Sequence, residues 1–317
     1  MSLTGENACR RGGVIGPTMS AAPGYLSDFP GIQTEITYLA PGSFVNRRFV
    51  APQREVNTGE YFSYPVTVRD ARPRQADFTI ASHGFELKIH RSAVRDFYDK
   101  DEVTRTYPDE VAAAVREWTA ADRVHTMSWM IRTSGDLSKH ARAEKDYKHS
   151  GGVQPPAAEA HCDASPDRVD AMARSYYRQR FPDAPPFTRF IYSSFWRTFS
   201  PPPQDYPLAL CDGNSVGDEE GVPNTLFVVD RIPSRQEMLA PVPDEDKKIA
   251  AAIFHHNPNH RWWYFSNMTR EEVLFIVFHD SRRVRPWRVP HTAFRDTSRP
   301  DAHPRASIEF RSIAYFS

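Results

Sequence analysis

The chain has 317 residues, of which 40% are hydrophobic, and its 40 Lys and Arg residues balance its 40 Asp and Glu residues. A chain of this length can bury a large hydrophobic core, which excludes a mini-protein or a disordered tail. Its zero net charge lacks the basic excess with which proteins bind a nucleic-acid backbone, so we expect no nucleic-acid partner.

No apolar run approaches the roughly 18 to 20 residues that cross a bilayer, and no apolar stretch follows Arg10 and Arg11 as in a secretory signal. Cys9, Cys162 and Cys211 are odd in number and form no CxxC pair, which argues against a disulfide framework and a zinc knuckle. We therefore expect a cytoplasmic protein without a membrane partner.

The first half of the chain is predicted to mix strands with one long helix. Residues 1–30 are rich in small residues and are expected to form a flexible arm. Short strands are expected between Gln33 and Tyr64, at Asp77–Ile80 and at Phe85–Ile89. Apolar residues then recur every three or four positions from Asp99 to Trp118, which predicts an amphipathic helix whose regular part begins at Pro108.

The rest of the chain is predicted to be mostly short strands. A strand at Val124–Arg132 precedes a polar loop or lid at 133–156, a helix begins at Ser165, and a single helical turn begins at Thr269. Further strands are expected at Phe187–Phe199, Pro207–Cys211, Thr225–Val229, Lys248–His255, His260–Phe265, Val273–His279, Trp287–His291 and Ala306–Phe316. This pattern predicts a mainly β fold, a jelly-roll barrel or sandwich with flanking helices, over residues 31–317.

The most informative motif is His161-Cys162-Asp163. On an extended strand His161 and Asp163 point to the same face, where both can reach one metal ion, while Cys162 points away. An HxD motif is common by chance, and a hydrogen-bonded pair at the start of a helix is the alternative interpretation. The motif becomes informative when a second histidine follows, because two His and one carboxylate leave three positions open on iron(II).

His291 is the best candidate for that second histidine, because Arg305 and Ser307 follow it. A guanidinium binds a carboxylate through two parallel hydrogen bonds, and a neighbouring hydroxyl adds a third, which suits the distal carboxylate of 2-oxoglutarate. Arg311 lies on the same predicted face and is either a second carboxylate ligand or the ion-pair partner of Glu309. Surface ion pairing is the alternative for these arginines, and the competing histidines are His255, His256, His260 and His279.

These motifs resemble the fungal and bacterial hydroxylase/desaturase group that includes cephalosporin methoxylation proteins, a gibberellin desaturase and the fungal aziridine-forming oxygenases. The resemblance spans about residues 33–316 and is carried by His161–Asp163, Phe195–Arg197, Pro207–Asp212, Trp262–Phe265, Glu272–Leu274 with Asp280–Ser281, His291–Phe294 and Arg305–Arg311. It implies a double-stranded β-helix, iron(II), 2-oxoglutarate, O2 and a role in secondary metabolism. It also implies that His161, Asp163 and His291 bind iron, and that Arg305 and Ser307 bind the co-substrate.

The substrate is expected to be a small molecule that undergoes hydroxylation, desaturation or ring closure; a small amino acid such as valine is one candidate, and a larger polyketide or terpenoid is equally open. Candidate substrate contacts, each with packing or solvation as its alternative, are Arg132, Trp196, Arg197, Ile308 and Phe310. Two other functions remain open: an iron oxidase in which Arg305 binds the substrate instead of 2-oxoglutarate, and a non-catalytic cupin-like barrel. A zinc hydrolase is weaker because the chain has no HExxH motif. A monomer or a homodimer is expected.

Overall fold

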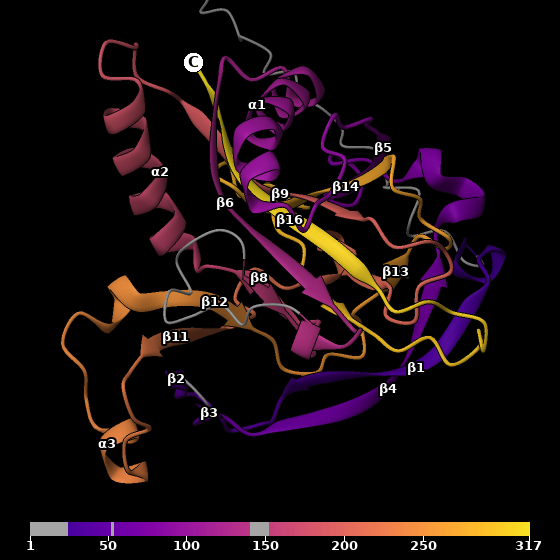
Figure 1. The fold of residues 1–317 in the computed structure, drawn as a ribbon. Coiled ribbons are helices and arrows are strands. Elements are labelled where there is room, and N and C mark those ends of the chain that lie inside the picture. Colours follow the sequence, from indigo (N-terminus) through magenta and orange to yellow (C-terminus); the bar gives the residue numbers. More distant parts are fainter. Residues whose placement is uncertain (1–24, 52–53, 140–151) are drawn as a thin grey trace, which may run out of the picture.

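Two β-sheets face each other in the computed structural model, which describes residues 25–51, 54–139 and 152–317 (Figure 1). The ten-stranded sheet has the order β1 (Gly31–Leu39), β4 (Tyr61–Asp70), β13 (Trp262–Tyr264), β10 (Leu208–Cys211), β15 (His291–Ala293), β8 (His161–Asp163), β12 (Ile249–Ile253), β11 (Val222–Val228), β2 (Asn46–Ala51) and β3 (Arg54–Asn57). The six-stranded sheet has the order β5 (Phe85–Ile89), β14 (Glu272–Asp280), β9 (Arg189–Thr198), β16 (Ala306–Phe316), β6 (Arg123–Thr133) and β7 (Val153–Gln154). The predicted jelly roll is confirmed.

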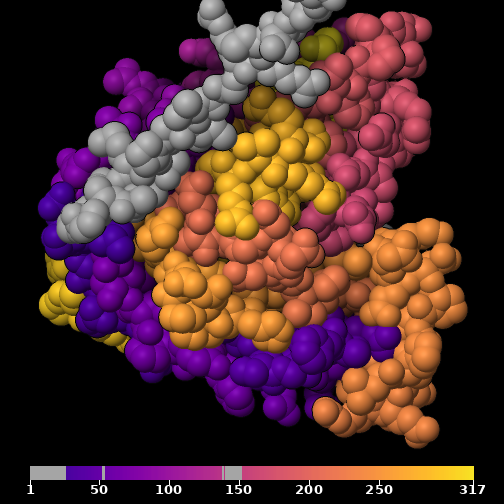
Figure 2. All heavy atoms as spheres, turned by 180° about the vertical axis from the view of Figure 1, so that it is seen from behind, coloured from indigo at the N-terminus to yellow at the C-terminus, as the bar shows by residue number. Residues whose placement is uncertain are grey.

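Helices flank these sheets, namely α1 (Lys100–Thr119), α2 (Pro166–Arg180) and α3 (Arg235–Leu239), with short 3-10 helices at Tyr25–Asp28, Arg72–Asp77, Leu137–Lys139, Gly213–Ser215 and Glu245–Lys248. The segment that carries α3 projects from one corner of the molecule, as both views show (Figures 1 and 2). Within the described part of the chain, no helix is both long and apolar enough to span a membrane.

Each face of the six-stranded sheet packs against its own hydrophobic core. One core fills the space between the two sheets and extends to α2, with residues such as Leu210, Ile276 and Tyr315. The other lies between the outer face of the sheet and α1, and includes Phe195 and Phe310. Since side chains alternate along a strand, neighbouring residues of β9 and β16 belong to different cores. This alternation decides which residues of these strands can reach the space between the sheets.

Helix α1 begins earlier than its sequence predicts. The side chain of Asp99 accepts hydrogen bonds from the backbone N–H groups of Asp101 and Glu102, which caps the first turn. The regular helix therefore starts at Lys100, and Pro108 lies inside it rather than at its beginning. Val103 and Val111 face the outer core, as the apolar spacing predicts.

Three other predicted boundaries are wrong for local reasons. Residues 77–80 end a 3-10 helix and enter a turn, because the Ser82 hydroxyl bonds to the Asp77 carbonyl and accepts from Thr79 N–H. Thr269 begins a turn rather than a helix: its N–H donates to the Glu272 side chain, and β14 starts at Glu272. The strand predicted from Trp287 begins only at His291.

The expectations for the arm and the lid fall largely outside the described residues, which exclude 1–24 and 140–151. Within the described part of the predicted arm, Phe29 is buried and packs edge-on against Trp263, with 4.8 Å between ring centroids. Residues 25–30 therefore belong to the packed fold. Helix α2 begins after Ser165 as predicted, although the Ser165 side chain makes no capping hydrogen bond.

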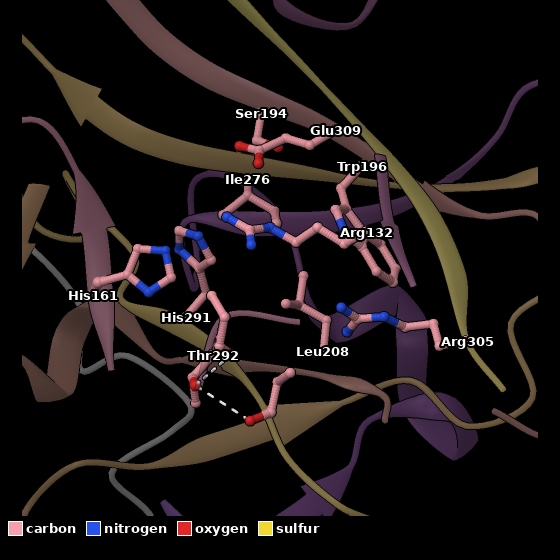
Figure 3. A pocket seen from close by; sticks show the side chains of 12 residues that line it. Arg132, His161, Ser194, Trp196, Leu208, Ile276, His291, Thr292, Arg305 and Glu309 are labelled. Atoms are coloured by element: carbon pink, nitrogen blue, oxygen red, sulfur yellow. Dashed lines mark hydrogen bonds between the residues drawn. The ribbon is translucent and has the colours of Figure 1, made fainter. Parts of the chain in front are cut away.

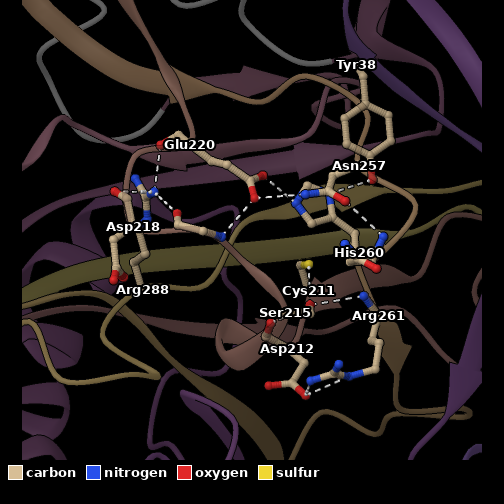
Figure 4. A network of polar contacts seen from close by, with 12 residues as sticks. Tyr38, Cys211, Asp212, Ser215, Asp218, Glu220, Asn257, His260, Arg261 and Arg288 are labelled. Carbon is tan, nitrogen blue, oxygen red and sulfur yellow. Dashed lines mark hydrogen bonds and ion pairs between the residues drawn. The ribbon is translucent and has the colours of Figure 1, made fainter.

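A polar network supports the ten-stranded sheet on the side of β1 and β13 (Figure 4). The hydroxyl of Tyr38 on β1 accepts from the Trp262 indole on β13 at 2.8 Å and lies 3.2 Å from Nδ1 of His260. Nε2 of His260 lies 2.7 Å from the Glu220 carboxylate. Because Tyr38 and Trp262 are fully buried, each polar atom requires such a partner, and the network ties β1, β13 and the segment before β11 together.

Buried His279 predicts how the stability of the fold depends on pH. Burial, assisted by Arg283, lowers the pKa of His279 from its usual 6.5 to about 4. Between these values the unfolded chain binds one more proton than the folded chain, so the free energy of unfolding rises with pH. We expect His279→Gln to reduce this slope by about 1.4 kcal/mol per pH unit in denaturant titrations of the metal-free protein.

At pH 7 to 8 the imidazole is neutral in both states, so the two stability profiles should run parallel there. Equal slopes between pH 4 and 6.5 would contradict the assignment of a buried neutral imidazole to His279.

Candidate metal centre and adjoining pocket

Three side chains that can bind a metal meet where β8 and β15 pair. These strands are antiparallel, and His161 is the direct register partner of His291, so their ring centroids lie 4.4 Å apart. Asp163 is two residues along β8 and points to the same face. The nitrogen and oxygen ligand atoms of His161, Asp163 and His291 all lie within 4.8 Å of one another. No other such cluster of His, Cys, Asp and Glu occurs among the described residues.

The backbone orients both imidazoles. Nδ1 of His161 donates to the Glu159 carbonyl at 2.8 Å, and Nδ1 of His291 donates to the Val289 carbonyl at 3.3 Å. A carbonyl can only accept, so each Nδ1 carries the proton and each Nε2 has a free lone pair, the arrangement of a metal-ligating histidine. Burial and the nearby His161 lower the pKa of His291 to about 3, which keeps it in the neutral form that binds metals.

The two oxygens of Asp163 face different partners. Oδ1 lies 3.9 Å from Nε2 of His161, and Oδ2 lies 2.6 Å from Nε of Arg311. The same Nε donates to Glu309 Oε1 at 3.3 Å. Although burial opposes it, these two carboxylates raise the pKa of Arg311. Arg311 is thus an ion-pair partner of Asp163 and Glu309, and we do not retain it as a second ligand for the co-substrate.

A pocket adjoins the triad between the two sheets (Figure 3). Its lining combines His161 and His291 with two arginines, one carboxylate and mostly apolar or hydroxyl side chains: Arg132, Ala157, Ser194, Trp196, Leu208, Ile276, Thr292, Ala293, Arg305 and Glu309. A metal bound by the triad would therefore face this pocket.

Neither arginine of this pocket forms an ion pair with a described carboxylate. Arg305 is 1% exposed, donates to the Tyr206 carbonyl at 2.8 Å and lies over the Trp196 ring, while its Nε has no partner. Arg132 donates to the Pro155 carbonyl at 2.8 Å. Burial, with Arg132 nearby, lowers the pKa of Arg305 to about 9. Buried guanidinium groups usually have an anionic partner, so the pocket favours anionic ligands.

Four other predicted site residues lie outside the pocket lining. The hydroxyl of Ser307 points to the Arg132 carbonyl at 3.4 Å. Arg197 faces α1 and donates to the carbonyls of His90 and Arg270, and Ile308 and Phe310 lie in the outer core. This corrects the expectation of substrate contact for Arg197, Ile308 and Phe310, because each is next in sequence to an inward-facing residue and so points to the opposite side of the sheet.

The sequence reasoning missed several pocket residues. Glu309 was considered only as an ion-pair partner, and Ser194 was not considered. Strand alternation was the signal that could have found them: Glu309 lies two residues from Ser307 and from Arg311, and Ser194 lies two residues from Trp196. Cys162 behaves as expected, because its thiol points away from the triad toward the Phe278 carbonyl at 3.3 Å.

Comparisons with known proteins agree with this fold. A family model described as an oxidoreductase/YMDC permease-like domain (YDMC) matches residues 36–315. The chain is 28% identical over 270 residues to the hydroxylase/desaturase efuI of Hormonema carpetanum, covering 81% of this chain and 85% of that protein. It is 30% identical over 263 residues to the hydroxylase/desaturase CTB9 of Cercospora beticola, covering 81% of this chain and 78% of that protein.

Among solved structures, the chain resembles the iron and alpha-ketoglutarate-dependent endoperoxidase NvfI with a TM-score of 0.71 and 22% identity. The match covers 90% of this chain and 98% of that one. At this level of identity the likeness shows a common fold.

The geometry predicts that the triad binds a divalent metal with one ion per chain. His161→Ala or Asp163→Ala each removes one of three ligands, so we expect the affinity for iron(II), measured by anaerobic calorimetry, to fall more than about 100-fold. His279→Ala is the matched control, because it truncates an equally buried histidine away from the triad. Wild-type affinity in either ligand variant would show that the metal binds elsewhere.

Proposed function

The chain belongs to the YDMC oxidoreductase family and is similar to fungal hydroxylase/desaturases and to a fungal Fe(II)/2-oxoglutarate-dependent dioxygenase, and we propose that His161, Asp163 and His291 hold its iron. Two imidazoles and one carboxylate on one face are the donors that suit iron(II) and leave open positions. Bound iron(II), with 2-oxoglutarate and O2, supplies the oxidation of an unactivated C–H bond. The donor set and its backbone anchors fit this metal.

Arg305 is proposed to bind the distal carboxylate of 2-oxoglutarate. The observation that carries the proposal is that a buried guanidinium with an unpartnered Nε faces the same pocket as the triad. A dianionic keto acid would supply the missing negative charge, and the planar guanidinium matches a carboxylate. Ser307 can assist only by holding the backbone of β6 against β16, because its hydroxyl bonds to the Arg132 carbonyl.

The substrate is proposed to be a small molecule with a carboxylate, a class that includes valine. Arg132 is the second guanidinium of the pocket that has no described carboxylate partner, and its end group lies beside the His291 ring (Figure 3). Apolar side chains of Trp196, Leu208 and Ile276 supply the remaining contact surface. Hydroxylation, desaturation or ring closure would then depend on how these residues orient the reacting carbon.

We also propose the domain organisation, the oligomeric state and the cellular location of the protein. Residues 31–317, with the packed residues 25–30, are proposed to act as one jelly-roll domain of an enzyme of secondary metabolism, as a monomer or a homodimer. Cys162 and Cys211 are buried free thiols, which supports a cytoplasmic location.

Arg305→Leu tests the assignment of the co-substrate. In an anaerobic titration with iron(II) and 2-oxoglutarate we expect wild type to develop the weak visible charge-transfer band of the chelate. Loss of a charged hydrogen-bonding group should weaken 2-oxoglutarate binding about 10- to 100-fold in the variant, with iron(II) affinity retained.

Arg189→Leu is the control, because Arg189 pairs with Asp280 on the same sheet but away from the pocket. An unchanged titration in Arg305→Leu would show that 2-oxoglutarate binds without Arg305, whereas the absence of the band in wild type would favour an iron oxidase that uses no 2-oxoglutarate.

A further inference from the structure

We propose that Arg311 is a positioning residue that restricts Asp163 to a one-oxygen ligand, and this inference rests on the proposed metal site. Arg311 does not line the pocket, so it acts on the site through the two carboxylates that it pairs with, Asp163 and the pocket residue Glu309. Its effect would be to set the number of positions that remain open on the metal.

The positions of the carboxylate oxygens support this role. Oδ1 of Asp163 is the oxygen near Nε2 of His161, on the side where the ligand atoms converge. Oδ2 forms an ion pair with Arg311 Nε at 2.6 Å, without the geometry of a hydrogen bond. A carboxylate that binds a metal through both oxygens must turn both toward the ion. Such a turn would take Oδ2 away from the guanidinium, so the ion pair favours binding through Oδ1 alone.

Glu309 holds the guanidinium in place from the other side. Its Oε1 accepts from the same Nε at 3.3 Å, so Arg311 lies between two carboxylates. The side chains are largely buried, with 22% of Arg311, 12% of Asp163 and 10% of Glu309 exposed. At such burial the loss of one partner leaves a charge that solvent compensates poorly. Rotation of Arg311 away from Asp163 would therefore be unfavourable.

The ion pair also joins the two sheets. Arg311 belongs to β16 of the six-stranded sheet, and Asp163 belongs to β8 of the ten-stranded sheet. The register of β16 against β6 shifts between Phe310 and Ser312, while Arg311 stays paired with Ser194 on β9. Arg311 thus projects into the space between the sheets from β16, a central strand of the six-stranded sheet. A side chain on such a strand is positioned more precisely than one on a loop.

The functional consequence is the number of open positions. With one oxygen from Asp163 and two imidazoles, a six-coordinate ion keeps about three positions for the keto acid and O2. With both oxygens bound, about two positions remain, and a keto acid that binds through two atoms would fill them. Arg311 would therefore preserve the position at which O2 reacts.

Arg311→Gln tests this with Mn(II) as a redox-stable probe. We expect Mn(II) affinity, measured from the free-ion EPR signal, to fall about 10- to 100-fold, as when a partner of a metal ligand is lost. We also expect the water-proton relaxivity of bound Mn(II) to fall by about one third, because a second Asp163 oxygen replaces one of about three water ligands.

Arg189→Gln is a closely matched control. Arg189 pairs with Asp280 at 2.5 Å, with 22% and 13% of the two side chains exposed, at a site remote from the triad. The Arg189→Gln variant shows how the loss of an ion pair on this sheet affects the protein in general. We expect its Mn(II) affinity and relaxivity to equal those of wild type. If the Mn(II) affinity and relaxivity of Arg311→Gln equal those of Arg189→Gln, the inference is overturned and the proposed function is unaffected.

Failure of wild type to bind Mn(II) or iron(II) would instead overturn the proposed function, and the inference with it. If Arg311→Gln does not fold, Arg311→Lys compared with Arg189→Lys decides the question. The lysine keeps the charge but lacks the planar guanidinium, so we expect Mn(II) binding weaker than wild type only at position 311. Equal binding by the two lysine variants overturns the inference.

Discussion

The pairing of β8 with β15 is the contact on which the rest of the site depends. His161 and His291 are distant in sequence, yet they are direct partners in an antiparallel ladder. Directly opposed residues have Cβ atoms about 5 Å apart, so the two imidazoles are brought together before any metal binds. The carbonyls of Glu159 and Val289 then fix the ring orientations. A metal site on paired strands requires little reorganisation of the chain when it is filled.

Charge is distributed unevenly around this pair of strands. Arg311 is neutralised by Asp163 and Glu309, whereas Arg305 and Arg132 have no described carboxylate partner. Since an unpaired buried charge is costly, the pocket is electrostatically incomplete until an anion binds. A divalent metal increases this demand for negative charge. The same groups therefore make a keto acid with two carboxylates a suitable ligand and leave Arg132 available to a substrate carboxylate.

The outer core explains why the site has these side chains and not their neighbours. Helix α1 covers one face of the six-stranded sheet and buries Ile308 and Phe310 there. Burial of these apolar residues makes the opposite face of β16 available for Glu309 and Arg311, and Arg305 lies just before the strand. Packing far from the chemistry thus determines the orientation of the arginines. A one-residue shift of β16 would exchange the two sets of side chains.

Residue type and spacing were sufficient to predict the β-rich fold and helix α1, and to select His161, Asp163 and His291, which the structure brings together, because ligand donors and apolar periodicity are local properties of the chain. They were not sufficient for Arg197, Ile308 and Phe310, whose side of the sheet follows from which face α1 covers. They also left open whether Arg311 binds the co-substrate or pairs with Glu309, and they did not predict its contact with Asp163. That contact required the tertiary structure, because Arg311 and Asp163 lie on different sheets and only the packing of those sheets brings their charges together.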